Sequence, residues 1–154
     1  MNSELSIQFF DQQFAEQSHT GDCKLNPFEL AAIPYLKGRL VDYGCGMGNL
    51  AFAAAIRHIQ QRAAAQALPV HGAVADLRDY ELNEDFDAVV SIGLLMFFDS
   101  PTAFRALSNL QARVREGGVA MVKVLIEGTI YLEMFDAKSH CLFSRAEMET
   151  RFSG

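Results

Sequence analysis

Short apolar runs alternate along the chain with longer segments in which apolar residues recur at helical spacing. The runs that predict strands lie at 40–43, 69–75, 87–92 and 119–126. The third run contains Val89, Val90 and Ile92, the apolar composition of a strand that is buried on both faces. Strands separated by helical segments indicate an α/β fold with a mostly parallel sheet.

A helix over 27–35 is predicted by its first residues. Asn26 is a good N-cap, Pro27 suits the first helical position, and Glu29 stands where a capping-box acid belongs. Gly38 follows and is expected to break the helix before the first strand.

Three further helices are expected. One follows the glycine-rich turn and covers 49–66, which contains neither Gly nor Pro. Another is capped by Ser100-Pro101 and ended by Gly117-Gly118, and the last opens with a capping box at Ser144 and Glu147. The inner face predicted for the second of these helices consists of Phe104, Leu107, Leu110 and Val114.

Composition excludes several classes of protein. The 154 residues form one expected domain, 1–154, and its net charge of −6 without a basic stripe argues against a nucleic-acid partner. The longest apolar stretch, 88–98, is too short to span a bilayer, so no membrane partner is expected. Residues 1–14 contain no basic residue, so they do not predict a signal peptide. Three widely spaced cysteines (Cys23, Cys45, Cys141) predict neither a disulfide framework nor a metal site and favour the cytoplasm.

The most informative feature is the segment Asp42-Tyr43-Gly44-Cys45-Gly46-Met47-Gly48-Asn49 between a predicted strand and a predicted helix. Glycines allow a sharp turn, and a helix N-terminus attracts anionic groups. The third glycine comes one position too early for the dinucleotide fingerprint, and no Gly-Lys-Ser/Thr follows for a phosphate loop. Asp42 would repel phosphate but attract an ammonium group. The turn therefore favours an amino-acid moiety as ligand.

This segment resembles the first motif of class I S-adenosylmethionine-dependent methyltransferases. Residues 74–77, 86–93 and 115–119 are similar to the third-strand motif, the fourth strand and the turn into the fifth strand of that family. Within the class, 127–143 is similar to the tellurite-resistance branch. The resemblance implies a Rossmann-like, doubly wound, mostly parallel sheet with helices on both faces. It also implies methyl transfer from S-adenosylmethionine, leaving S-adenosylhomocysteine, to a small-molecule acceptor, with an oxyanion such as tellurite suggested by the branch.

The resemblance also implies a set of cofactor-binding residues. The glycine turn would line the methionine part, Asp42 would hold its ammonium, and Asp76 would accept from the adenine amine. The end of the fourth strand would lie beside the sulfonium. The full set is Asp42, Gly44, Cys45, Gly46, Gly48, Asn49, Leu50, Asp76, Leu77, Ser91, Ile92, Gly93 and Met96.

Fewer residues can be assigned to binding of the methyl acceptor. Residues 1–25 are expected to form a leader or a lid, in which Phe10 and Phe14 would face the substrate, and 26–154 would be the cofactor-binding core. Glu127, Tyr131 and His140 follow the last predicted strand, where sites gather in such folds. No catalytic residue is assigned, because a nucleophilic acceptor needs no general base.

The chain departs from the family in one place. No Asp or Glu lies between Gly48 and Asp76, where the family carries a ribose-binding acid, and no second strand is legible there. The C-terminal strand pair of the family is not legible either. Either the natural protein lacks the second-strand piece or only the present chain does. An alternative function is therefore a catalytically inactive cofactor-binding or interaction module, whereas an NAD-type oxidoreductase is disfavoured by the same gap. The sequence predicts no oligomeric state.

Overall fold

The computed structural model describes residues 27–44, 73–132 and 140–153, together with Phe135 and the positions 8, 12, 15, 16 and 19. Helices and strands alternate in this part of the chain, which confirms the predicted α/β class. The elements are α2 (Pro27–Ala32), η1 (Ile33–Tyr35), β1 (Leu40–Asp42), β2 (Phe86–Ile92), η2 (Leu95–Phe97), α4 (Ser100–Ala112), β3 (Val114–Lys123) and α5 (Arg145–Phe152).

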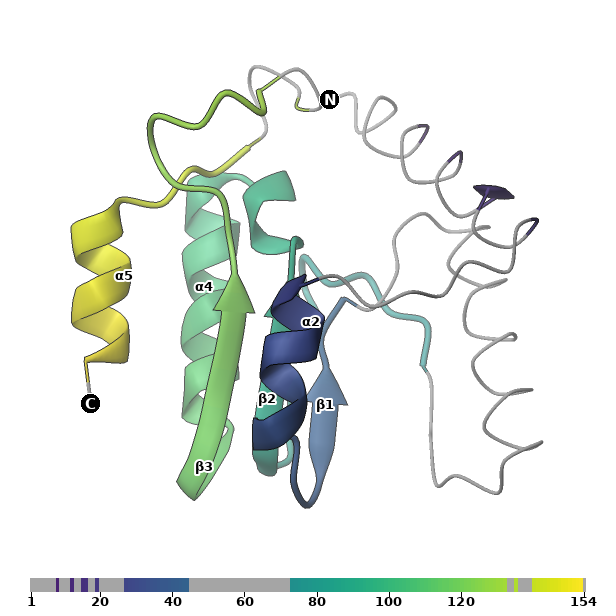
Figure 1. The fold of residues 1–154 in the computed structure, drawn as a ribbon, viewed down its shortest axis with the longest axis vertical. Helices are drawn as coiled ribbons and strands as arrows, with labels where there is room; N and C mark the ends of the chain where they lie inside the picture. The colour runs from purple at the N-terminus through teal and green to yellow at the C-terminus, as the bar shows by residue number, and fades with distance from the viewer. Residues whose placement is uncertain are drawn as a thin grey trace.

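The three described strands form one parallel sheet in the order β1-β2-β3. Val41 is the register partner of Val89, and Val89 is the partner of Ala120. The strands run in the same direction, so their carboxyl ends meet at one edge, the upper edge in Figure 1. α4 lies behind the sheet in this view and α2 lies in front of it. This arrangement is the mostly parallel sheet, covered on both faces, that the sequence predicts.

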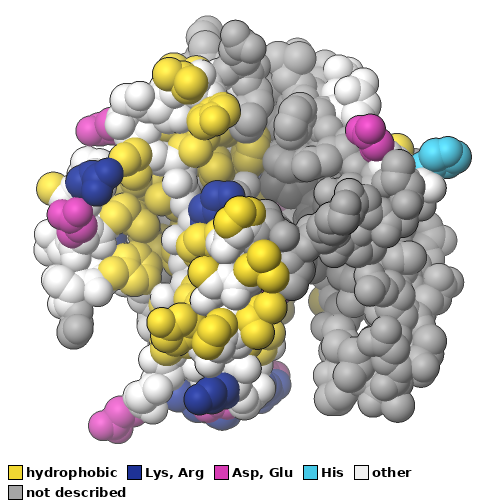
Figure 2. Space-filling model, viewed as in Figure 1, with side chains coloured by type: hydrophobic (Ala, Val, Ile, Leu, Met, Phe, Trp, Pro, Cys, Tyr) yellow, Lys and Arg dark blue, Asp and Glu magenta, His cyan; other side chains and the backbone are white. Residues whose placement is uncertain are grey.

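The core lies between the sheet and α4. Val89 of β2, Leu107 and Leu110 of α4, and Phe143 of the segment before α5 are fully buried. α2 contributes little to this core, because Ala32 is its buried residue while Leu30 is 55% exposed. Hydrophobic side chains accordingly gather on the surface over α2 (Figure 2).

The predicted helix over 27–35 is confirmed, with its last turn in the tighter 3-10 form. The helical segment ends at Tyr35, with Leu36 as its C-cap, so the helix stops before Gly38 rather than at it. Gly38 instead lies in the bend that leads into β1, where the structure gives a reason for glycine. Its φ is +68°, and a Cβ at this position would overlap the Asp87 carboxylate. Asp87 in turn accepts from the Arg39 backbone N–H at 2.6 Å. The turn into β1 is therefore fixed by β2.

The N-cap predicted for α4 is wrong by one residue. Asp99, rather than Ser100, caps this helix, and its carboxylate accepts from the Thr102 backbone N–H at 2.9 Å. This hydrogen bond holds the pKa of Asp99 below its usual range. A carboxylate is favoured at this end of a helix because the helix dipole is positive there.

The predicted end of α4 is also wrong. The helix ends at Ala112, and Gly117-Gly118 lie within β3, which begins at Val114. The β2–β3 register shifts between Phe86 and Ala88, and regular pairing resumes at Val119. The glycines permit this irregularity, because Gly117 has a φ of +75° and a Cβ on Gly118 would lie 2.8 Å from the Asp87 carbonyl oxygen.

The strand predicted over 69–75 is not formed in its described part. Residues 73–75 have no ladder partner among the described strands, and the Val74 side chain is 59% exposed. The helix predicted over 49–66, the missing second strand and the leader's Phe10 and Phe14 lie outside the described residues. The capping box before α5 is confirmed in part, since the Ser144 hydroxyl accepts from the Glu147 backbone N–H at 3.1 Å. Among the helices the structure describes, none has the length and apolarity to cross a bilayer.

Candidate functional site at the carboxyl ends of the strands

Several of the predicted cofactor residues meet at the carboxyl edge of the sheet. Asp42 ends β1 with an exposed side chain, and Ile92 ends β2. Backbone hydrogen bonds continue past the strands, from Tyr43 N–H to the Val90 carbonyl at 2.8 Å and from Gly93 N–H to the Lys123 carbonyl at 2.9 Å. The starts of the loops after β1 and β2 are therefore held in place by neighbouring strands.

Gly44 is the described glycine of the turn after β1. Its φ is +85°, and a Cβ there would overlap the side chain of Leu94, which follows β2. The conformation and the close packing both require glycine at this position. The other predicted turn residues (Cys45, Gly46, Gly48, Asn49 and Leu50) lie outside the described residues.

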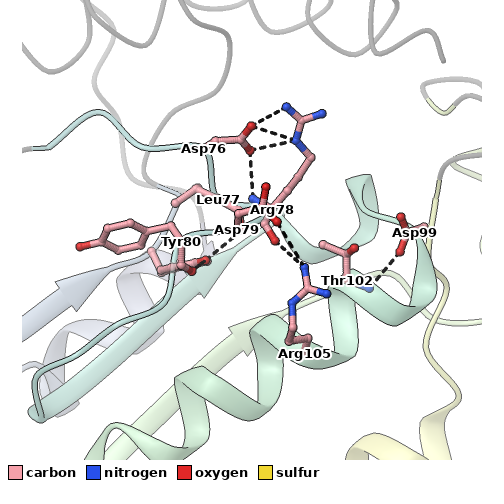
Figure 3. A network of polar contacts seen from close by, with 9 residues as sticks. Asp76, Leu77, Arg78, Asp79, Tyr80, Asp99, Thr102 and Arg105 are labelled. Carbon is pink, nitrogen blue, oxygen red and sulfur yellow. Dashed lines mark hydrogen bonds and ion pairs between the residues drawn. The ribbon is translucent and has the colours of Figure 1, made fainter.

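Asp76 opens a turn that Figure 3 shows from close by. The turn is closed by hydrogen bonds from Asp79 N–H and Tyr80 N–H to the Asp76 carbonyl oxygen, at 3.2 and 2.9 Å. The Asp76 carboxylate accepts from the Arg78 guanidinium, with an Nε–Oδ1 distance of 2.8 Å. These hydrogen bonds hold the pKa of Asp76 below its usual range, so this exposed carboxylate is ionised at neutral pH. It retains lone pairs with which to accept a further hydrogen bond.

The Asp76 turn is anchored to α4. Arg105 of α4 donates from Nη2 to the Arg78 carbonyl oxygen at 2.6 Å, as Figure 3 shows. Further along, Leu82 N–H donates to the Asn109 side-chain oxygen at 2.9 Å. Leu77 is partly buried and packs against the hydrophobic core. Helix α4 therefore supports the loop from outside the predicted site.

Tyr43 is a residue of this site that the sequence reasoning missed. Its side chain is 3% exposed, and its hydroxyl lies 3.0 Å from the Leu77 carbonyl oxygen and 2.8 Å from that of Tyr80. Burial raises the pKa of Tyr43 to about 12. A large aromatic residue between Asp42 and Gly44 is the signal that could have drawn attention to it.

The residues after β2 are mostly buried. Ser91 is fully buried, and its hydroxyl has no hydrogen-bond partner among the residues that the structure describes. Met96 is 6% exposed, and its carbonyl oxygen accepts from the Cys141 backbone N–H at 3.0 Å. Gly93 has a φ of +66°, and among the described residues other than its chain neighbours no atom lies within 4 Å of where its Cβ would be. The carboxyl end of β2 therefore combines an unpaired buried hydroxyl with open space beside Gly93.

Substituting Ser91 with alanine is expected to raise the free energy of unfolding by about 1 kcal/mol, because a buried hydroxyl without a partner is costly. Urea unfolding of the two proteins measures this change. A role for the Ser91 hydroxyl in ligand binding would appear as weaker ligand affinity in the more stable variant. A loss of stability would contradict the prediction, since it would mean that the hydroxyl is satisfied in the folded protein.

The acceptor-side residues follow β3 and lie in two groups. Glu127 and Tyr131 are exposed. His140 is partly buried and stacks on Phe135 with a ring-centroid distance of 5.5 Å, and Phe135 packs against Phe97 of η2 at 4.9 Å. The structure therefore brings His140 beside the residues that follow β2, whereas Glu127 and Tyr131 remain on the surface.

Two solved structures share the fold of this chain, and a third is less similar. The "DhpI-SAH complex structure" has a TM-score of 0.55 and 16% identity, covering 99% of this chain and 88% of that chain. The "DhpI-SAM-HEP complex" has a TM-score of 0.52 and 16% identity, covering 99% and 90%. The sugar N-methyltransferase KedS8 from Streptoalloteichus sp ATCC 53650 is 23% identical over 84% of this chain and 52% of that chain, with a TM-score of 0.39. None of the curated proteins matches this chain.

The described sheet is parallel, and both DhpI structures share the Rossmann-like α/β fold to which it belongs. A family profile described as "Tellurite resistance protein TehB" matches residues 51–132, which is more than half of the chain. The chain belongs to the TehB family. The resemblance to class I methyltransferases and to their tellurite-resistance branch is thereby confirmed.

Proposed function

We propose that this chain transfers the methyl group of S-adenosylmethionine to a small-molecule acceptor and releases S-adenosylhomocysteine. The proposal rests on one juxtaposition. The turn at Asp42 and Gly44 and the Asp76 turn both lie beyond the carboxyl end of β1, joined through Tyr43. The carboxyl edge of a parallel sheet is the usual ligand site of such folds. Membership of the TehB family and a fold shared with structures whose titles name SAH and SAM support the proposal.

The described residues fit this cofactor. Asp42 offers a carboxylate to the ammonium of the methionine part, and the ionised Asp76 offers acceptor oxygens to the adenine amine. No described residue occupies the space where a Cβ on Gly93 would lie, which leaves room for a ligand group at the end of β2. S-adenosylmethionine supplies an electrophilic methyl group on a sulfonium. We assign to Asp42, Asp76 and Gly93 the task of binding and orienting it.

We infer that the chain accelerates methyl transfer by positioning the cofactor and the acceptor. Holding two reactants at attack distance and excluding water supplies much of the acceleration in a displacement reaction. The Cys141 backbone N–H donates to the Met96 carbonyl oxygen at 3.0 Å, and His140 directly precedes Cys141. The segment that carries His140 is therefore joined to η2, which follows β2. The proposed acceptor-side residues are therefore His140, with Glu127 and Tyr131 at the rim. The description of the family names tellurite resistance, and on that ground we propose an oxyanion such as tellurite as the acceptor.

Calorimetric titration with S-adenosylhomocysteine tests the proposal. We expect micromolar binding to the unmodified protein, weakened about tenfold or more by Asp76→Ala, which corresponds to about 1.4 kcal/mol. Asp79→Ala is the matched control, because Asp79 lies in the same turn but carries no predicted cofactor contact. Its carboxylate lies 3.9 Å from Arg105 on the surface, and we expect the affinity to change less than about twofold.

Binding without turnover would favour the alternative, an inactive cofactor-binding module. Labelled methyl transfer to tellurite and related oxyanions, to thiols and to small amines separates the two functions. If no heat is released at any concentration of S-adenosylhomocysteine, the fold has been retained without this cofactor and the proposal is wrong.

A further inference from the structure

The two halves of the proposed cofactor site come from distant parts of the sequence. Asp42 ends β1 and Gly44 belongs to the turn after it, whereas Asp76 and Leu77 follow a long intervening segment. A ligand that reaches from one turn to the other binds well only if the two turns keep a fixed separation. Some contact between them must therefore set that separation in the free protein.

Tyr43 is firmly attached to the first half. It follows β1 directly, and its backbone N–H donates to the Val90 carbonyl oxygen at 2.8 Å, which extends the β1–β2 ladder by one residue. Its ring is 3% exposed and belongs to the hydrophobic core. The position of the Tyr43 hydroxyl is therefore determined by the sheet and the core.

The Tyr43 hydroxyl is also hydrogen-bonded to the second half of the site, the Asp76 turn. It lies 3.0 Å from the Leu77 carbonyl oxygen and 2.8 Å from the Tyr80 carbonyl oxygen, across sequence separations of 34 and 37 residues. A hydroxyl has one proton, so this proton is shared between the two carbonyl oxygens. Both acceptor residues belong to the Asp76 turn: Leu77 directly follows Asp76. The Tyr80 backbone N–H closes the turn by donating to the Asp76 carbonyl oxygen at 2.9 Å.

Neighbouring groups keep the hydroxyl protonated. Burial raises the pKa of Tyr43 to about 12, with smaller contributions from Tyr80, Asp76 and Glu81 that outweigh the opposing effect of Arg105. Tyr43 therefore donates a hydrogen bond throughout the neutral range. Phenylalanine would fill the same space but would leave both carbonyl oxygens without this donor.

We propose that Tyr43 is a positioning residue of the cofactor site, whose hydroxyl fixes the Asp76 turn at a set distance from the glycine turn. This inference rests on the proposed function, because it assigns the two turns to opposite ends of one cofactor. Loss of the hydroxyl loosens the Asp76 turn and weakens cofactor binding, while the acceptor side, built from the residues after β2 and β3, is unaffected. Tyr43 thus acts on the KM for the cofactor and leaves kcat unchanged.

Two measurements on Tyr43→Phe test this inference. In the free protein, amide hydrogen exchange at Asp79 and Tyr80 is expected to accelerate about tenfold, because the turn opens more often. In calorimetry, the Kd for S-adenosylhomocysteine is expected to rise about tenfold, which corresponds to about 1.4 kcal/mol. In kinetics, the KM for S-adenosylmethionine rises by a similar factor, while kcat stays within about twofold.

Tyr35→Phe is the matched control, since Tyr35 is 60% exposed and lies on η1, before β1. It should change neither the exchange rates nor the Kd. If Tyr43→Phe lowers the melting temperature but leaves the exchange rates and Kd unchanged, Tyr43 is merely structural and the inference is overturned. If the unmodified protein binds no S-adenosylhomocysteine, the proposed function fails instead, and the exchange experiment still tests the hold of Tyr43 on the turn.

Discussion

Replacing Gly44 with alanine is expected to lower the free energy of unfolding by about 2–4 kcal/mol and to abolish detectable binding of S-adenosylhomocysteine. The backbone at Gly44 has a φ of +85°, where a Cβ costs about 1–2 kcal/mol. The new methyl group would also overlap Leu94, which is 3% exposed and packed in the core. Relief of this overlap must move either the turn after β1 or the residues after β2, and both belong to the proposed site. Urea unfolding and calorimetry measure the two effects.

Gly117→Ala separates the strain from the overlap. Gly117 has a φ of +75°, but no atom lies within 4 Å of where its Cβ would be, and it belongs to β3 near the amino end of that strand. We expect the free energy of unfolding of this control to fall by about 1–2 kcal/mol, the cost of the strained backbone alone. We expect it to bind the cofactor as the unmodified protein does. Equal losses in the two variants, or unchanged binding in Gly44→Ala, would contradict the prediction.

The elements that the sequence predicted well are those with strong local signals. Pro27 at the start of a helix, the apolar run 87–92 and the Ser144 cap each act within a few residues. The misplaced N-cap of α4 is a local error of one residue, whereas its misplaced end arises because a distant partner decides the structure. Gly117-Gly118 are common helix-ending residues, but here they lie within β3, where Gly118 accommodates the Asp87 carbonyl of the neighbouring strand. Pairing across a sheet is not encoded in the local pattern.

In the candidate site, too, residues with a local sequence signal were predictable and residues with distant partners were not. The motif at Asp42 and Gly44 could be located from its glycines and from its resemblance to a family. The role of Tyr43 could not, because its acceptors are backbone carbonyls, which every residue carries, at separations of 34 and 37 positions. Ser91 shows the converse case, since the resemblance singled it out while the structure leaves its hydroxyl without a partner.

Phe143→Ala is expected to cost about 3–5 kcal/mol of unfolding free energy, the usual range for a fully buried phenylalanine. Phe143 is 0% exposed and meets Phe104 of α4 edge to face, with ring centroids 5.1 Å apart. The methyl group of alanine would leave most of this volume empty. For a chain of this length, such a loss lowers the melting temperature by about 10 °C, which thermal unfolding can measure.

Phe143→Ala is also expected to affect the residues proposed to bind the methyl acceptor. Phe143 N–H donates to the Leu125 carbonyl at 3.1 Å, and its carbonyl accepts from Glu127 N–H at 3.0 Å, so its ring anchors a short parallel segment beside the end of β3. Loosening that segment releases His140, three residues before it, and methyl transfer should fall more than cofactor affinity does. Phe152→Ala is the matched control, since its side chain is 38% exposed, and it should cost less than about 1 kcal/mol. Equal destabilisation by the two variants would contradict the assignment of Phe143 as the anchor. If cofactor affinity and turnover fell by the same factor, Phe143 would support the whole carboxyl edge of the sheet rather than the acceptor-side residues alone.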